Sequence, residues 1–337
     1  MGKYLKFKEI PTGAADIKTV ALVTEIEEAT ANNGDTYVTV TLSDGESEPI
    51  KAKMWSTKKS ALLFNVEDLI AVVLDKKIYR DAVSYILKRT ESAPPDVDIS
   101  EYRTHPPLPE VTMYNGIIEN VKRGVSLTPV KGEGMFDLSD LVAGMYEQNK
   151  EKLLYWSAAK SMHHNMYGGL LYHTYSMTRS LLCDYMAYKD FYKIDTEVLL
   201  AGAALHDIGK IRELETTSLG TADYTIEGNL LGHLLIGIMM VQEYVSEMKH
   251  KYGDNVFDDT KVLHLLHLIA SHHNKLEYGA IKVPATVEAS LLAYIDDKDA
   301  HLFQMDRARD SVEEGEITSP IFGVGRVWHP GKKTETT

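Results

Sequence analysis

The sequence predicts a multidomain protein in which a small N-terminal β-barrel precedes an all-α helical bundle. Two observations predict the division into two modules, and the strand and helix patterns described below predict the type of each. Residues 1–90 hold 13 Lys and Arg against 13 Asp and Glu, so the rest of the chain carries the whole formal net charge of −13. None of the 13 histidines precedes His105, and eleven of them lie from His163 to His301. A neutral, histidine-free segment followed by an acidic, histidine-rich one indicates two modules with different tasks.

The overall composition is that of a globular protein with a sizeable core, because 44% of the 337 residues are hydrophobic and 25% are charged. No apolar run reaches membrane-spanning length and the first residues lack the apolar region of a signal peptide, so we expect a cytoplasmic protein that does not use a membrane. The single cysteine, Cys183, lies in an apolar helical stretch and is expected to be a buried structural thiol. The negative net charge argues against unspecific binding of duplex nucleic acid.

The N-terminal module is predicted from about five short stretches of strand character within residues 15–90. The first is rich in Val, Ile and Thr, and the second and third alternate between apolar and polar residues. Turn residues separate them. The expected strands cover residues 18–26, 37–42, 50–55, 69–74 and 83–87. Five short strands with turns favour a small barrel, of which the OB-fold is one candidate, and we assign it residues 1–92.

One strand of this barrel has a composition suited to single-stranded nucleic acid. In the alternating stretch 50–55, Lys51, Lys53 and Trp55 share one face while Ile50 faces inward. Cations on such a face meet phosphates, and an aromatic ring stacks on a base. The alternative is an ordinary solvated face with the indole packed on a neighbouring loop, and the spacing alone does not decide between them.

A proline-rich linker and a helical lead-in are predicted for residues 93–165. The linker holds the prolines of Pro94-Pro95 and of the run that begins at Pro106, which propagate neither a helix nor a central strand. Helical patterns follow at residues 112–123 and 138–162. A glycine-containing loop, Gly124 to Gly134, is expected between them.

The following segment, residues 166–312, is expected to be helical throughout. Its helical patterns cover residues 170–188, 196–208, 228–250, 260–272 and 286–310. The tail, residues 313–337, contains Pro, Gly and Lys and is expected to be extended or disordered.

Metal-binding side chains recur on these predicted helices. The apolar run before His206-Asp207 ends in an adjacent imidazole and carboxylate, which are costly to desolvate unless a partner such as a metal ion takes them both. Each histidine alone is better explained as an ordinary hydrogen-bonded side chain. The ordered set suggests helices that converge on one di-metal site: His173, His206, Asp207, His233, His272, His273 and Asp296.

This order of ligands resembles that of the HD-domain metal-dependent phosphohydrolases. The stretches Leu205-His-Asp-Ile-Gly-Lys210, Glu227-Gly-Asn-Leu-Leu-Gly-His233, Ser271-His-His273 and Tyr294-Ile-Asp-Asp-Lys-Asp-Ala300 further resemble the YhaM-type 3′→5′ exoribonucleases. That family joins an N-terminal OB-fold to a C-terminal HD domain. The resemblance covers roughly residues 15–325.

Matching positions carry roles over from the family. The resemblance implies a first metal ion on His173, His206, Asp207 and Asp296, and a second on His233 and His272 with His273, bridged by Asp207. Two divalent ions about 3.5–4 Å apart can clamp a phosphodiester and lower the pKa of a shared water. The family favours Mn²⁺, while imidazole and carboxylate ligands also suit Fe²⁺, Zn²⁺ or Mg²⁺.

Two further residues lie near the ligands in the sequence. Lys210, three residues after Asp207, is predicted to offer its ammonium to a phosphate, although a solvated lysine is the alternative. Asp299 is a helical neighbour of Asp296 and is expected to contact a metal-binding side chain without binding the metal itself. Asp297 is expected to point to solvent.

Two residues outside the ligand set complete the prediction. His164 belongs to a His-His pair that also occurs in YhaM-type proteins, and it is expected to support the ligands or to serve a structural role. Arg307 is predicted to contact a phosphate further along the substrate, although such charged helix faces are usually solvated.

These observations predict a metal-dependent exoribonuclease that hydrolyses single-stranded RNA to nucleoside monophosphates, and the resemblance implies the 3′→5′ direction. Whether single-stranded DNA is a substrate as well stays open. Two alternatives stay open: an HD phosphohydrolase of small cyclic or triphosphate nucleotides, and a non-catalytic single-strand-binding adaptor. The sequence leaves the oligomeric state open, including a homo-oligomer.

Overall fold

The computed structural model describes residues 4–31, 34–79, 82–129, 131–160, 166–217, 219–309, 311–321 and 323–331. The chain forms two compact units, one of residues 106–303 and one of residues 1–105 together with 304–337. Along the described residues, no helix is long and apolar enough to cross a membrane.

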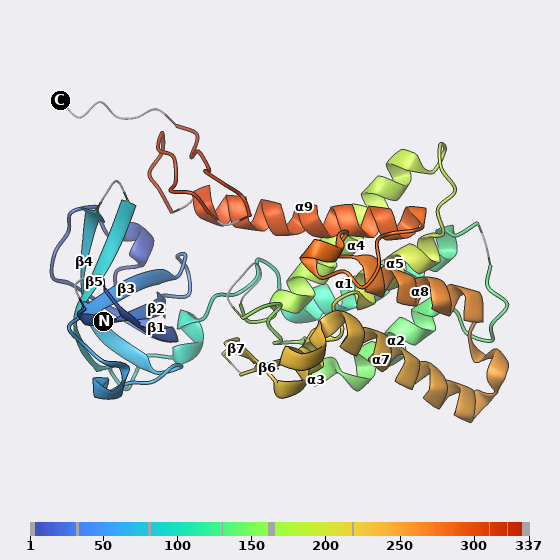
Figure 1. Ribbon diagram of the computed structural model, residues 1–337, viewed down its shortest axis with the longest axis horizontal. Helices are drawn as coiled ribbons and strands as arrows, with labels where there is room; N and C mark the ends of the chain where they lie inside the picture. The colour runs from blue at the N-terminus through green and yellow to red at the C-terminus, as the bar shows by residue number, and fades with distance from the viewer. Residues whose placement is uncertain are drawn as a thin grey trace. The chain divides into compact units, whose positions relative to one another are not determined.

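The N-terminal unit contains a closed five-stranded barrel with the strand order β1-β2-β3-β5-β4 (Figure 1). Its strands are β1 Ile17–Thr30, β2 Thr36–Ser43, β3 Ile50–Trp55, β4 Leu69–Tyr79 and β5 Ala82–Ser92. Strands β3 and β5 pair in parallel, and the other neighbours pair antiparallel. All five predicted strands are present, and only β3 has the predicted length, because the others continue beyond their alternating apolar centres.

The barrel core follows from the alternation of the strands. On β2 the fully buried residues are Val38, Val40 and Leu42. On β3 Ala52 is fully buried and Ile50 is nearly so. Successive side chains of a strand point to opposite faces, so the polar residues between them lie on the outer surface. The predicted inward orientation of Ile50 is confirmed.

The second unit is helical and is organised around a buried helix. Its helices are α1 Glu110–Leu127, α2 Leu138–Gln148, α3 Lys150–Leu153, α4 Gly169–Tyr188, α5 Thr196–Leu205, α6 Lys210–Glu213, α7 Ile226–Tyr252, α8 Asp259–Ser271 and α9 Val287–Arg309, whose last residues belong to the other unit. Every residue of α5 is buried. It packs against α1, α2, α4 and α8 (Figure 1). The Asp195 side chain begins α5 by accepting hydrogen bonds from the backbone N–H groups of Glu197 and Val198.

The helices of the predicted lead-in segment differ from expectation. Helix α1 extends through Gly124, where a Cβ would lie only 2.7 Å from the carbonyl oxygen of Thr196, so glycine permits close packing on α5. The predicted helix 138–162 instead breaks at Asn149, which leaves the helical conformation while its amide donates to the Met145 carbonyl. Both α1 and α2 contribute to the core of the helical unit.

Four other features of the fold were missed or predicted wrongly. The short helix α6 and the hairpin of β6 Leu214–Thr216 and β7 Ala222–Tyr224 have too few residues to show a period. Cys183 is exposed, because the adjacent Leu181 and Leu182 take the buried face of α4. In its described part the tail folds back on itself, and the Thr318 N–H donates to the Val327 carbonyl at 2.9 Å.

Candidate metal centre

Asp207 lies at the centre of a polar cluster inside the helical unit. Helix α5 ends at Leu205, and the chain turns through His206 and Asp207 before α6 begins. The turn lies directly against α7, since a Cβ on Gly209 would be 2.0 Å from the His233 carbonyl oxygen. Glycine at 209 therefore allows the backbone of the turn to approach α7 and brings Asp207 close to His233.

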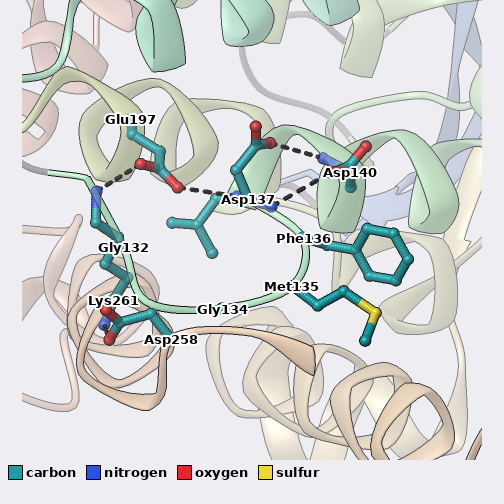
Figure 2. Close-up of a pocket in the computed structure, with 10 residues that line it drawn as sticks. Gly132, Gly134, Met135, Phe136, Asp137, Asp140, Glu197, Asp258 and Lys261 are labelled. Atoms are coloured by element: carbon teal, nitrogen blue, oxygen red, sulfur yellow. Dashed lines mark hydrogen bonds and ion pairs between the residues drawn. The ribbon is translucent and has the colours of Figure 1, made fainter. Parts of the chain in front are cut away.

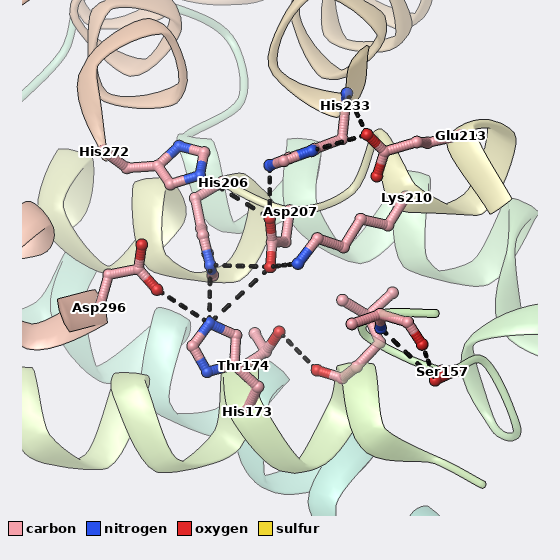
Figure 3. Close-up of polar contacts among 12 residues, drawn as sticks. Ser157, His173, Thr174, His206, Asp207, Lys210, Glu213, His233, His272 and Asp296 are labelled. Carbon is pink, nitrogen blue, oxygen red and sulfur yellow. Dashed lines mark hydrogen bonds and ion pairs between the residues drawn. The ribbon is translucent and has the colours of Figure 1, made fainter. Parts of the chain in front are cut away.

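One group of ligand atoms lies around the Oδ2 oxygen of Asp207 (Figure 3). The Nε2 atom of His206 is 3.4 Å from this oxygen, and that of His173 is 3.8 Å away. The Nε2 atoms of His173 and His206 are 3.1 Å apart. The Oδ1 atom of Asp296 is 3.1 Å from the Nε2 atom of His173. These four residues come from α4, the turn after α5, and α9, and they are the predicted first-ion ligands.

A second group faces the other oxygen of the same carboxylate. The Asp207 Oδ1 is 3.3 Å from the Nε2 of His233 and 3.7 Å from the Nε2 of His272 (Figure 3). His233, His272 and His273 offer ligand atoms that all lie within 4.8 Å of one another. Asp207 thus has one oxygen toward each group, as a bridging carboxylate requires.

The four histidines closest to Asp207, together with His273, divide into these two groups, and the Nδ1 atom of each of these five rings has an acceptor. Backbone carbonyls serve three rings, and carboxylates serve two. The acceptors are the carbonyls of Ala203 for His206, Ile269 for His272 and Tyr278 for His273, and the carboxylates of Asp299 for His173 and Glu213 for His233. A ring whose Nδ1–H donates in this way presents Nε2 to a metal ion.

Two of these contacts arise from the helix ends themselves. His206 and His272 each follow the last residue of a helix, α5 and α8 respectively, and each ring donates to the carbonyl three residues earlier. Carbonyls in the last turn of a helix lack intrahelical partners. A histidine at this position therefore satisfies an orphan acceptor and fixes its own tautomer.

The charges of the cluster depend on mutual pairing. Burial favours neutral carboxyls, but Lys210 and His206 outweigh burial and hold the pKa of Asp207 well below its usual value. Burial likewise opposes a charged His173, yet hydrogen bonds to Asp296 and Asp299 raise its pKa to about 10. A cation would replace the proton that this ring holds at Nε2.

Two rings of the second group have lowered pKa values for a different reason. Burial lowers the pKa of His272 well below its usual value, and the neighbouring His206 lowers it further. Burial and His233 act in the same direction on the pKa of His273. Both rings therefore keep the neutral form that metal binding needs.

The cluster fits a divalent metal ion because several of its buried polar atoms have no hydrogen-bond partner in the part of the chain that the structure describes. Among the described residues, Asp207 Oδ1, His233 Nε2 and His272 Nε2 are buried and have no hydrogen-bond partner. Buried polar atoms are normally paired, and these three converge on one another. Imidazole nitrogen and carboxylate oxygen are ligands that Mn²⁺, Fe²⁺ and Zn²⁺ accept.

Lys210 is held at the edge of the cluster. Its Nζ lies 2.8 Å from Asp207 Oδ2, and its side chain is buried. The indole N–H of Trp156 donates to the Lys210 carbonyl at 2.8 Å and fixes the main chain there. The predicted proximity of this ammonium to Asp207 is present.

The remaining predicted residues are distributed differently. Asp299 receives the Nδ1–H of His173 at 2.8 Å, as expected for a residue behind the ligand, whereas Asp297 is exposed. His164 lies outside the described residues. Arg307 lies outside this cluster, in the N-terminal unit, and its Nε is 3.0 Å from Glu48 Oε1. Its contact with RNA stays a prediction.

The barrel strand carries an aromatic pair with a cation above it. Trp55 is 49% exposed, and its ring centroid is 5.0 Å from that of Tyr37 on β2. The Lys53 ammonium lies 5.1 Å from the centroid of the Tyr37 ring and 5.5 Å from that of the Trp55 ring. Lys51 instead approaches Glu25 and Glu27 at 3.8 Å and 3.9 Å. Tyr37 was not singled out from the sequence, although it opens the alternating stretch 37–42.

A separate pocket of about 210 Å³ lies beside the loop that contains Gly132 and Gly134 (Figure 2). Its buried Lys261 ammonium pairs with Glu197 and lies 3.2 Å from Asp195 Oδ2. Glu197 also accepts the Leu138 N–H at 3.0 Å. Because these charges pair with each other, the pocket is better explained as part of the packing between helices than as a reaction site.

The chain is similar in sequence to known proteins over most of its length. The family model of the HD domain matches residues 170–301. The 3′-5′ exoribonuclease YhaM of Bacillus subtilis is 32% identical over 298 residues, which cover 87% of this chain and 88% of that protein. The Bacillus licheniformis protein of the same name is 33% identical over the same shares, and that of Listeria welshimeri is 28% identical over 91% and 92%.

Proposed function

Because this chain belongs to the family of the YhaM 3′-5′ exoribonucleases, we propose that it is a metal-dependent enzyme that removes nucleoside monophosphates from the 3′ end of single-stranded RNA. The observation that carries this proposal is the convergence of two groups of ligand atoms on the two oxygens of Asp207.

Each group would hold one divalent ion. His173, His206 and Asp296 would bind one ion with Asp207, and His233, His272 and His273 would bind the other with the same carboxylate. When bound, such ions supply Lewis acidity that polarises a phosphodiester and lowers the pKa of water. The resemblance to YhaM-type proteins favours Mn²⁺, and the donor set also suits Fe²⁺, Zn²⁺ or Mg²⁺.

The reaction is the hydrolysis of the last phosphodiester. The oxygen of water forms a bond to phosphorus, the bond from phosphorus to the preceding 3′ oxygen breaks, and a proton from water ends on that leaving oxygen. The products are a nucleoside 5′-monophosphate and a strand one nucleotide shorter. Lys210 would donate to a phosphate oxygen, where negative charge grows during the reaction.

The barrel would hold the single strand. Its strand order and size support assignment as an OB-fold in residues 1–92, while the HD domain of residues 166–312 carries the reaction. Trp55 and Tyr37 would stack on bases while Lys53 meets a phosphate, and Lys51 would add charge near the same face. Single-stranded DNA also offers aromatic bases that can stack and phosphates that can pair with cations, so we include it as a substrate.

The test uses 5′-labelled single-stranded RNA and DNA with Mn²⁺, Mg²⁺ or a chelator, and the products are sized over time. We expect the labelled strand to shorten stepwise, and we expect the chelator or Asp207→Ala to stop the reaction. Shortening that persists in Asp207→Ala with chelator would contradict the proposal. Turnover of cyclic dinucleotides or nucleoside triphosphates without turnover of RNA would favour the small-nucleotide alternative.

A further inference from the structure

We propose that Glu213 is a positioning residue that sets the orientation and tautomer of His233 and thereby the affinity of the second metal ion; this inference rests on the proposed two-metal function. The Oε1 atom of Glu213 is 3.0 Å from the ring Nδ1 of His233 and also 3.0 Å from its backbone nitrogen (Figure 3). One carboxylate oxygen therefore fixes both the main chain and the ring of the same ligand.

The backbone N–H of His233 is available because α7 is interrupted immediately before it. Gly232 has φ 71° and ψ 156°, a conformation outside the helical region that glycine adopts without strain. His233 thus begins a new helical segment, whose first N–H groups have no intrahelical acceptor. A carboxylate at this end is favoured by the hydrogen bond and by the helix dipole.

The main chain holds Glu213 in place for this contact. The Thr225 N–H donates to the Glu213 carbonyl at 2.9 Å. A Cβ on Gly228 would lie 2.1 Å from the same carbonyl oxygen, so the first turn of α7 packs directly on it. Glu213 is also buried, which limits the competition of water for its carboxylate.

Glu213 takes the same place in one ligand group that Asp299 takes in the other. Of the five rings, only His173 and His233 have a carboxylate on Nδ1, while His206, His272 and His273 have a backbone carbonyl. A carboxylate partner holds the tautomer and raises the basicity of the metal-binding nitrogen. Loss of Glu213 should therefore weaken the ion bound by His233 and spare the ion bound by His173.

The test measures Mn²⁺ binding by calorimetry and electron paramagnetic resonance in full-length variants. Glu213→Ala removes the acceptor, Glu213→Asp withdraws it by one methylene, and Glu213→Gln keeps an acceptor oxygen without the charge. Glu215→Gln is the matched control, because Glu215 is exposed two residues away on β6. We expect Ala and Asp to weaken one of two binding events by about 10–100-fold, Gln to weaken it less, and the control to match the parent. Two ions bound by folded Glu213→Asp with parental affinity would overturn the inference.

A second measurement separates this inference from the proposed function. In the metal-free protein with ¹⁵N-labelled histidine at alkaline pH, the His233 ring should carry its proton on Nδ1 in the parent and lose that preference in Glu213→Ala and Glu213→Asp. An unchanged tautomer in both variants would overturn the inference. A parent protein that binds a single Mn²⁺ would instead contradict the two-metal function, and the tautomer would still decide the role of Glu213.

Discussion

Gly209→Ala perturbs the closest backbone approach in the site. The added Cβ would lie 2.0 Å from the His233 carbonyl oxygen, whereas an ordinary carbon–oxygen contact needs about 3.3 Å. The turn that carries Asp207 must therefore move from α7 by about 1.3 Å, the difference between those two distances. Such overpacking costs about 1–3 kcal/mol of stability. Because His233 Nε2 is now 3.3 Å from Asp207 Oδ1, a shift of this size separates the ligand groups and should lower activity about 100-fold.

Gly237→Ala is the matched control on the facing helix. Its Cβ would meet the nearest atoms, Gly209 N and an Ile269 methyl, at 3.4 Å, which is ordinary contact. Alanine also favours a helix over glycine by about 1 kcal/mol, so this variant should be as stable and active as the parent or slightly more stable. Urea denaturation, Mn²⁺ titration and RNA hydrolysis compare the three proteins. Parental stability and turnover in Gly209→Ala, or equal losses in both variants, would show that the close approach at Gly209 does not position Asp207.

Three further perturbations test the role of Lys210, the stacking face of the barrel and the pairing of Asp75. Lys210→Gln should lower the maximal rate of RNA hydrolysis by about 100–1000-fold while both Mn²⁺ ions still bind, and an unchanged rate would remove Lys210 from the reaction. Trp55→Ala should weaken oligonucleotide binding by about 1–3 kcal/mol, as measured by fluorescence anisotropy. Ile78→Ala, which changes another exposed barrel residue, is the control. Equal affinities of Trp55→Ala and the parent for the oligonucleotide would exclude stacking on this face. The hydrogen bond from Lys88 lowers the pKa of Asp75 to about 2, so its contribution to stability is present above about pH 4 and is lost as the pH falls toward 2. Urea midpoints of Asp75→Asn should therefore vary less with pH across this window than those of the parent, and parallel curves would contradict the pairing.

Long periodic segments and ordered ligands could be predicted from the sequence. The strands of the barrel and the helices α4, α5, α7, α8 and α9 have enough residues to show a period of two or 3.6. The ligand order placed His173, His206, Asp207 and Asp296 together before their distances were known. These predictions succeed because amphipathic elements must bury one face, and the buried polar residues on them then need partners.

Features that depend on backbone approach could not be predicted in this way. Glu213 lies outside the long segments whose hydrophobic period can be recognised in the sequence. Its contact with His233 depends on the interruption of α7 at Gly232. The exposure of Cys183 depends on which face of α4 meets a neighbour, and a local pattern does not contain that information. Tyr37 could have been found, because its antiparallel strand places it opposite Trp55.

Anomalous diffraction from crystals soaked in Mn²⁺ tests whether Asp207 bridges two metal ions. We predict two anomalous peaks about 3.5–4 Å apart, one beside each oxygen of Asp207, and neither peak in crystals of Asp207→Asn. A single peak, or two peaks that both lie away from Asp207, would contradict this bridging role.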